Sequence, residues 1–334
     1  MPTVSILKVI TVGILRASSA LFPMYDDKEA VLDMFLKGKA AKLKKIISVI
    51  FLIATFICAG YSFSYAEKNF LWRVQSKRNT VYVLGSIHLL KKDVYPLSRV
   101  IESAFEKSNV LAVEADVSDI SRLDLQKLMD SAFYPAGDSL DKHVSGKTFN
   151  LIKEETARAG LPMELVYNQK PWFLGLTLES VELMKSGYDP NYGIDKYFLS
   201  KVEGRKKISE LESLDYQINL LAGLNDEEQE LFLLYTLNEL KILVQEVDKL
   251  VDAWKSGAVE KMESTITKSL AEDRRFYTIY DKLIYKRNRN MAQKIDGYLK
   301  TNNTYFVVVG AAHLVGDRGI IQLLMDKGYS VEQL

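Results

Sequence analysis

Two histidines of this chain follow the same short pattern, in segments that lie far apart in the sequence. Residues 80–84 and 304–309 are runs of mostly β-branched, aromatic and aliphatic side chains, and each run is followed by glycine and, three residues later, by His88 or His313. Such runs predict buried strands. Each histidine is then expected just beyond the carboxyl end of a strand, where open α/β sheets bind ligands. The chain has only three histidines, so the repeat favours a shared site.

Gly85 and Gly310 end the two runs. We expect glycine there because the chain must leave each strand through backbone angles that a residue with a Cβ would resist. The plainer alternative is that His88 and His313 each cap their own turn from strand to helix, with no common ligand.

Acidic side chains are expected at the same edge of the sheet. Residues 109–113 predict a second buried strand that ends at Glu114 and Asp116, and residues 97–107 between the strands have the apolar spacing of a helix. A strand–helix–strand unit of this kind predicts two parallel neighbouring strands, which would place Glu114 beside His88. A buried carboxylate is costly without a partner, although either acid could simply cap the next turn.

Three further candidates follow turns or strands or lie on a helix. Asp195 comes after a turn rich in glycine, proline and asparagine, and it either caps the helix predicted for residues 196–202 or joins the site. Glu212 follows a short strand predicted for residues 206–211. Arg287 lies in a helical segment and, if it faces a cleft, could bind a carboxylate or an anionic intermediate.

Composition limits the functions that the chain can have. Of its 334 residues, 48% are hydrophobic and 26% are charged, which is typical of a globular protein. The net charge of +1 gives no sign of a nucleic-acid partner. Cys58 is the only cysteine, which excludes an intrachain disulfide framework and a multi-thiolate zinc site. Any bound metal would therefore need histidine and carboxylate ligands.

Residues 34–66 have the features of a secretory signal peptide. Lysines precede a short apolar run at residues 46–60, and a small-x-small sequence ends at Ala66. The run is short for a membrane span, although an uncleaved N-terminal anchor is the alternative. We expect Met34 to be the true start, which makes residues 1–33 an artefact of start assignment. The alternative is that residues 1–33 are a real, poorly structured cytoplasmic leader.

The mature chain is predicted to be a single α/β domain over residues 67–334, exported to the periplasm or the exterior. A helical region at about 120–300 separates the two strand–glycine–histidine units, and residues 329–331 predict a closing edge strand. We expect a mixed, mostly parallel sheet built from both halves, with the helices inserted between them. Asn225 and Glu228 predict a capping box within the insertion.

The chain resembles the TraB/GumN family, which includes the Tiki proteins, from about residue 80 to its C-terminus. The resemblance implies a mixed α/β core related to erythromycin-esterase-like and haem-binding ChaN-like proteins. The motifs that carry it are Gly-x-x-His at 85–88 and 310–313, Val-Glu-Ala-Asp at 113–116, Lys-Pro-Trp at 170–172, Gly-Ile-Asp at 193–195, Leu-Glu at 211–212 with Gln217, and Arg-Asn at 287–288.

Carried over residue by residue, the resemblance implies a site of His88, Glu114 and His313, with Arg287 as a possible anion partner. Tiki members are described as metal-dependent proteases that use manganese or cobalt. The resemblance therefore implies a divalent metal ion (Mn, Co or Zn) and a peptide or protein substrate. Such a metal would lower the pKa of bound water and polarise the scissile carbonyl group. Glu114 would then be either a ligand or the general base.

Two other functions stay open at this point. In a metal-independent hydrolase resembling the erythromycin esterases, a histidine oriented by Glu114 would activate water directly. A non-catalytic haem- or metal-binding protein would need apolar walls and an axial ligand such as histidine or tyrosine, and the composition supplies both. We expect membrane contact only through the N-terminal segment, if that segment is not cleaved.

Overall fold

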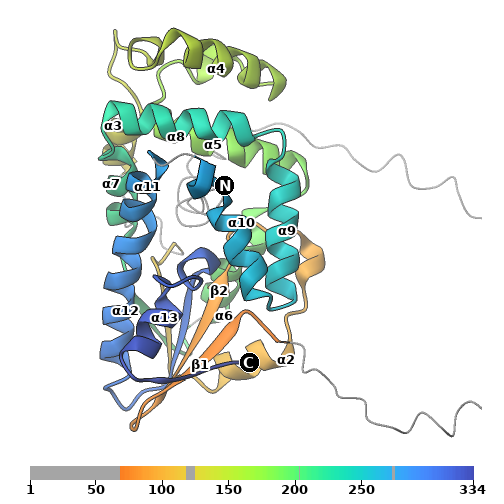
Figure 1. Cartoon of the computed structure of the whole chain (residues 1–334), viewed down its shortest axis with the longest axis vertical. Helices are drawn as coiled ribbons and strands as arrows, with labels where there is room; N and C mark the ends of the chain where they lie inside the picture. Colours follow the sequence, from red (N-terminus) through yellow and green to blue (C-terminus); the bar gives the residue numbers. More distant parts are fainter. Residues whose placement is uncertain (1–67, 118–124, 203, 273–274) are drawn as a thin grey trace, which may run out of the picture. The chain divides into compact units, whose positions relative to one another are not determined.

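The computed structural model in Figure 1 describes residues 68–117, 125–202, 204–272 and 275–334. The predicted signal peptide, residues 34–66, and the leader before it lie outside the described residues. Within these four ranges, none of the helices combines the length and the apolar character that crossing a bilayer requires.

Six strands form one mixed sheet, in the order β4-β3-β5-β2-β1-β6. Strands β4, β3, β5 and β2 run parallel to one another, whereas β1 is antiparallel to both β2 and β6. The predicted α/β class, with a mixed and mostly parallel sheet, is confirmed. The strands are β1 Leu71–Gln75, β2 Thr80–Ser86, β3 Val110–Val113, β4 Lys207–Glu210, β5 Tyr305–Gly310 and β6 Ser330–Gln333.

The order of the central strands differs from the sequence prediction. Strand β5, from the C-terminal half, lies between β2 and β3, so the expectation that β2 and β3 are direct neighbours is wrong. The pattern of strand, helix and strand sets the hand and the parallel direction of the crossover. It does not say whether a strand from elsewhere lies between the two. All six residues of β5 are buried, as befits a strand covered on both faces of a parallel sheet.

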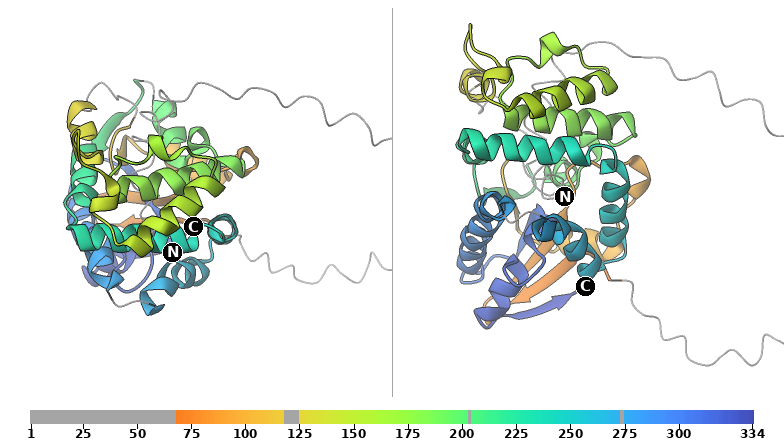
Figure 2. Two further views of the ribbon diagram at one scale, coloured as in Figure 1. Left: turned by 90° about the horizontal axis from the view of Figure 1, so that it is seen from above. Right: turned by 45° about the horizontal axis from the view of Figure 1, so that its top comes forward.

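The helices surround this sheet and lie largely in the insertion between β3 and β5. In Figures 1 and 2, α5 and α8 pass across the carboxyl ends of the parallel strands, and α9 and α10 run down one side. The α-helices are α2 Arg99–Glu106, α3 Leu125–Ala132, α4 Gly146–Arg158, α5 Pro171–Lys185, α6 Ile194–Val202, α7 Leu214–Ala222, α8 Asp226–Glu239, α9 Leu243–Lys255, α10 Val259–Glu272, α11 Phe276–Tyr280, α12 Lys286–Tyr298 and α13 Ile320–Asp326.

Short helical turns join these elements and include one stretch of π-helix. The π-helix, η7 Asp281–Tyr285, lies between α11 and α12. The 3-10 turns are η2 Lys92–Val94, η4 Leu140–Lys142, η5 Met163–Leu165, η6 Pro190–Tyr192 and η8 Ala311–His313.

Two local predictions can be checked directly. The capping box is present at the start of α8, where Asn225 Oδ1 accepts from the Glu228 backbone N–H at 2.9 Å and Glu228 Oε2 accepts from the Asn225 N–H at 3.1 Å. The predicted closing strand is present as β6 at the edge of the sheet. Strand β1 was not predicted, because its sequence, Leu-Trp-Arg-Val-Gln, has only a weak alternation of apolar and polar residues.

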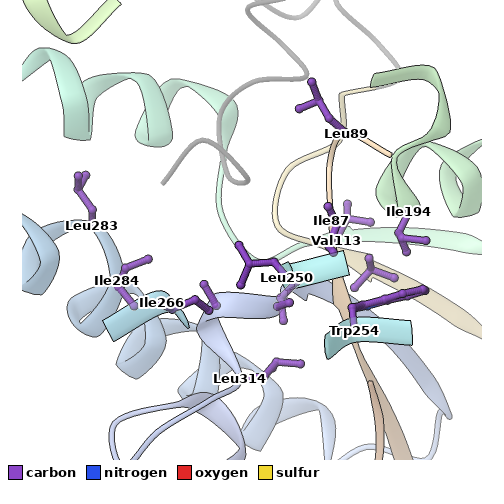
Figure 3. Close-up of a cluster of buried hydrophobic side chains, with 14 of the residues drawn as sticks. Ile87, Leu89, Val113, Ile194, Leu250, Trp254, Ile266, Leu283, Ile284 and Leu314 are labelled. Atoms are coloured by element: carbon purple, nitrogen blue, oxygen red, sulfur yellow. The ribbon is translucent and has the colours of Figure 1, made fainter. Parts of the chain in front are cut away.

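The carboxyl ends of the strands are packed in apolar side chains. Figure 3 shows residues from the ends of β2 and β3 close to residues from α9, α10 and η7. This packing lowers the local dielectric around polar groups at the strand ends, which strengthens their mutual interactions. The labelled residues are Ile87, Leu89, Val113, Ile194, Leu250, Trp254, Ile266, Leu283, Ile284 and Leu314.

Candidate functional site

The parallel strands bring four polar side chains into one row. In sheet order, β4, β3, β5 and β2 are followed by Glu212, Glu114, His313 and His88. All four side chains are buried. The two Gly-x-x-His segments come from opposite ends of the described chain, and they become neighbours because β2 and β5 pair directly.

Glu114 makes contacts in three directions. Its Oε1 accepts from the Gly310 backbone N–H at 2.5 Å, and its Oε2 accepts from Arg287 Nη2 at 2.7 Å and from Gln217 Nε2 at 3.2 Å. Oε1 also lies 3.9 Å from His313 Nε2. Burial raises the pKa of Glu114, and the charge of Arg287 opposes that rise. The carboxylate is therefore held in place by donors while its basicity is increased by burial.

Arg287 is the counter-ion of two carboxylates. Its Nε donates to both oxygens of Glu212 at 3.0 Å, its Nη2 donates to Glu212 Oε2 at 2.6 Å as well as to Glu114, and its Nη1 donates to the Leu283 carbonyl at 3.1 Å. Burial alone would lower the pKa of Arg287, but the two carboxylates raise it. Gln217 Nε2 bridges the same two carboxylates, with 3.1 Å to Glu212 Oε2. All three guanidinium nitrogens are engaged within the protein, so a role toward a substrate anion stays a prediction.

His313 is fully buried and rests against an amide. Its Nδ1 lies 2.6 Å from Asn288 Oδ1, and Asn288 Nδ2 donates to the Arg318 carbonyl at 2.8 Å. Burial, followed by the charges of Arg287 and His88, lowers the pKa of His313 well below its usual value. The imidazole is therefore neutral. Its Nε2 has no hydrogen-bond partner among the described residues.

His88 faces a carboxylate instead. Its Nδ1 lies 2.5 Å from Asp195 Oδ2, and both side chains are buried. The two atoms form a close polar pair whose geometry is not that of a hydrogen bond. The charge of His88 contributes to lowering the pKa of both Glu114 and His313. The three side chains therefore lie close enough to interact.

A close approach of two backbones brings Asp195 to His88. The Ile194 backbone N–H donates to the Ile87 carbonyl at 3.1 Å, which joins the start of α6 to the end of β2. A Cβ on Gly193 would overlap the carbonyl group of His88. The Gly-Ile-Asp motif therefore has a steric reason: only glycine lets α6 begin where its second residue reaches the imidazole.

Gly85 is needed for space, and the backbone of Gly310 supplies a donor that any residue except proline could also supply. Neither is among the glycines with positive φ, and Gly310 has φ −51°, so the expectation that backbone angles require glycine there is wrong. A Cβ on Gly85 would overlap the ring of Phe70 and lie 3.2 Å from Ala311 Cα. Gly310 supplies the N–H that binds Glu114.

Asp116 has a different place from Glu114. Its backbone N–H donates to Glu210 Oε1 at 2.8 Å, which ties the segment after β3 to the end of β4. Glu212, a secondary candidate in the sequence, is by contrast part of the cluster, because it accepts three hydrogen bonds from Arg287.

Two members of the cluster had no role assigned from the sequence alone, Asn288 and Gln217. Helical spacing could have found the first, because Arg287 and Asn288 each lie four residues before a buried apolar residue of α12, Met291 and Ala292. Polar residues on a stripe that is otherwise apolar need partners inside the protein. For Gln217 the same signal is weaker, since α7 is short.

Comparison with known proteins places this α/β fold and its row of strand-end side chains in a family. A model of the TraB/PrgY/gumN family matches residues 70–333. The chain belongs to this family, and the resemblance described above is confirmed.

Curated relatives span bacteria and animals. The chain is 26% identical over 246 residues to the uncharacterized protein YbaP of Escherichia coli K12, which covers 73% of this chain and 87% of YbaP. It is 22% identical over 319 residues to metalloprotease TIKI2 of Danio rerio (79% of this chain, 60% of that protein). It is 23% identical over 321 residues to a metalloprotease TIKI homolog of Nematostella vectensis, covering 79% and 66%. No solved structure matches.

The donor atoms at the strand ends suit a divalent cation in their chemistry. In the part of the chain that the structure describes, no three or more His, Cys, Asp or Glu side chains are grouped as a ready-made metal site. However, Nε2 of His88 and Nε2 of His313 are buried and have no hydrogen-bond partner in the described ranges. Buried polar atoms of this kind call for an explanation, such as a bound ion. Neutral imidazole with a carboxylate is a donor set for Mn, Co or Zn.

Proposed function

We propose that the protein is a metal-dependent hydrolase of peptides or proteins. In this proposal His88 and His313 hold the metal through their Nε2 atoms, Asp195 orients His88 from the Nδ1 side of the ring, and Glu114 is the proton acceptor. Both oxygens of Glu114 already accept hydrogen bonds, which favours the role of base over that of ligand. The names of the Tiki relatives, metalloproteases, support a hydrolase.

Charge balance is the observation that carries the proposal. The site contains three buried carboxylates, those of Glu114, Glu212 and Asp195, and Arg287 is the only buried lysine or arginine among the described residues. Arg287 can balance one of these three carboxylates, and the other two each need a proton or a cation nearby. Buried charges are strongly disfavoured unless they are paired or coordinate a metal. A divalent cation held by the Nε2 atoms of His88 and His313 would supply positive charge beside these carboxylates.

Each side chain of the site has a separate role in the proposed hydrolysis. A bound divalent ion would activate water and polarise the scissile carbonyl. Glu114 accepts the proton of the attacking water at a carboxyl group whose pKa is raised by burial, and a general base works best with a pKa near the operating pH. Arg287 and the Gly310 N–H keep Glu114 in one orientation. Apolar packing around the strand ends excludes competing water.

A metal-independent hydrolase is the second candidate, and the close pair of His88 and Asp195 favours it. A buried carboxylate that holds Nδ1 of a histidine is the arrangement that orients a general base in many hydrolases. In this version Asp195, rather than Glu114, orients the histidine. His88 would then take the proton of water directly.

Metal content distinguishes the two candidates. We would measure it by elemental mass spectrometry on the full chain, prepared without a His tag and offered Mn, Co and Zn. The parent should contain about one ion per chain, and the ion should be lost in His88→Ala and in His313→Ala. Hydrolysis of unstructured peptides should be lost with the metal and on chelation.

The third histidine provides a matched control. His143 lies outside the strand ends, where its Nε2 contacts Asp138 at 2.9 Å, so His143→Ala should keep the metal. Metal retained in both strand-end variants would contradict the shared site. Hydrolysis that persists in metal-free protein would support the second candidate.

We also propose that the protein is exported, on the strength of the signal-like pattern at residues 34–66. The exported form should then begin near Glu67, which intact-mass measurement of the secreted or periplasmic fraction can establish. An N-terminus at Met1 or Met34 in the membrane fraction would instead support an uncleaved anchor.

A further inference from the structure

We propose that Asn288 is a positioning residue that fixes the tautomer of His313, with the proton on Nδ1 and the lone pair of Nε2 directed toward Glu114. The catalytic use of that lone pair rests on the proposed function, but the tautomer does not. Nothing in the sequence motifs alone assigns this role, because Asn288 is separated from His313 by a helix, a strand and their connections.

The orientation of the Asn288 amide follows from its far side. The Arg318 carbonyl can only accept a hydrogen bond, so the amide group 2.8 Å away from it must be Nδ2. The amide oxygen is then the atom that faces His313, at 2.6 Å from Nδ1. In the reverse orientation, Asn288 Oδ1 would face the backbone carbonyl oxygen of Arg318. That buried carbonyl would then lose its donor.

The orientation of the amide decides the position of the proton. An amide oxygen accepts only, so Nδ1 of His313 must donate and therefore carries the hydrogen. The other tautomer would set the Nδ1 lone pair against an oxygen at 2.6 Å, in a buried place where acceptors cannot turn to water. With Nδ1 protonated in a neutral ring, Nε2 is unprotonated.

The resulting lone pair points into the cluster. His313 Nε2 lies 3.9 Å from Glu114 Oε1, beyond hydrogen-bond distance, and it has no hydrogen-bond partner among the described residues. Two acceptors that face each other in a buried site are compatible when a donor or a cation lies between them. Metal-bound histidines commonly have their other ring nitrogen fixed in this way by a carbonyl or carboxylate.

The two Gly-x-x-His motifs therefore end in different partners. His313 rests on a neutral amide, whereas His88 rests on the carboxylate of Asp195. An amide orients the ring without favouring a positive charge on it, and a carboxylate does both. Asn288 thus makes His313 the histidine whose lone pair is fixed, although the sequence presents the two motifs as equivalent.

Ring nitrogen NMR tests the tautomer directly. The full chain, labelled with ¹⁵N at histidine, contains only three imidazoles, and His143→Ala identifies one of them. In the parent, with and without chelator, His313 should show a protonated Nδ1 and an unprotonated Nε2. A protonated Nε2 with an unprotonated Nδ1 in the chelator-treated parent would overturn the proposal without any variant at position 288.

Two substitutions at Asn288 show whether its side chain orients the His313 ring or only fills space beside it. Asn288→Leu has a similar volume and no acceptor, so the Nδ1–H signal of His313 should be lost in favour of Nε2–H, which lies on the side of Glu114 Oε1 at 3.9 Å. Asn288→Asp keeps an acceptor and should keep the Nδ1–H form. Asn290→Leu and Asn290→Asp, at an exposed position of the same helix, should leave the spectrum unchanged. An unchanged spectrum in folded Asn288→Leu would contradict the proposal.

The outcomes also separate this inference from the proposed function. If the parent holds no metal but His313 is in the Nδ1–H form, the metal-dependent hydrolase fails and the positioning role stands. If the metal is present and is lost in the histidine variants, but the tautomer is the other one, only the positioning role fails.

Discussion

Replacing Arg287 by methionine should lower the free energy of unfolding by about 3–5 kcal/mol, the cost of removing one partner from a buried ion pair. The substitution leaves Glu114 and Glu212 as neighbouring buried carboxylates that still share the side-chain donor Gln217. Chemical denaturation followed by circular dichroism measures the loss. Arg289→Met, at an exposed position two residues further on, should change stability by less than about 0.5 kcal/mol.

A second substitution should restore part of that loss. In Arg287→Met with Glu212→Gln, one of the two unpaired charges is gone, so the double variant should be more stable than the sum of the single effects predicts. Additive effects would mean that Arg287 and Glu212 do not interact as their 2.6 Å contact indicates.

The stability lost in Arg287→Met should also depend on pH, and it should be smaller in acid. Burial already raises the pKa of Glu114, and the opposing charge of Arg287 is removed in the variant. The folded variant then binds protons that the unfolded chain has released, so its stability falls as pH rises. The deficit should be largest at neutral pH and should shrink as pH falls toward about 4.3, the ordinary value for glutamate. A deficit that grew in acid would contradict this account.

Replacing Gly193 by alanine should cost at least about 3 kcal/mol, the upper end of the usual range for overpacking. The added Cβ overlaps the backbone carbonyl of His88, and neither partner is the flexible end of a side chain. To relieve the clash, α6 must move away from β2, which breaks the hydrogen bond from Ile194 to Ile87 and separates Asp195 from His88. Denaturation measures the stability, and the ring nitrogen signals of His88 report the local change.

Gly146→Ala is the matched control for this substitution. Gly146 begins α4, has no positive φ, and a Cβ there would meet nothing within 4 Å. Alanine should therefore be neutral, or should stabilise the protein by up to about 1 kcal/mol through the unfolded state. If Gly193→Ala changed the free energy of unfolding no more than Gly146→Ala does, the close approach of α6 to β2 would not be needed for stability.

The sequence predicts the elements of this fold better than their order in space. Runs of buried apolar residues identify β2, β3 and β5, because such runs have few other uses. Periodicity does not encode which strands pair, so the place of β5 between β2 and β3 was not foreseen. The presence of His88 and His313 at one edge of the sheet follows from the repeated motif. Their different partners do not, since Asp195 and Asn288 reach them through tertiary packing.

The same limit applies to the charged residues. A strand that ends in Glu114 indicates a buried carboxylate, and helical spacing indicates a buried Arg287. That these two groups bind each other, and share Glu212, depends on how α12 docks against the end of β3. Local patterns show that a polar group needs a partner, whereas the partner itself is chosen by the packing of helices on the sheet.

The central position of β5 also determines when the sheet can be completed. Residues 305–310 join the two parts of the sheet, yet they come near the end of the chain. Until they emerge during synthesis, the four strands that precede them can form only two separate native pairs, β1 with β2 and β3 with β4. Each pair has an open edge that belongs against β5. A chain that stops before β5 thus lacks its middle strand and exposes two edges that can pair with other chains.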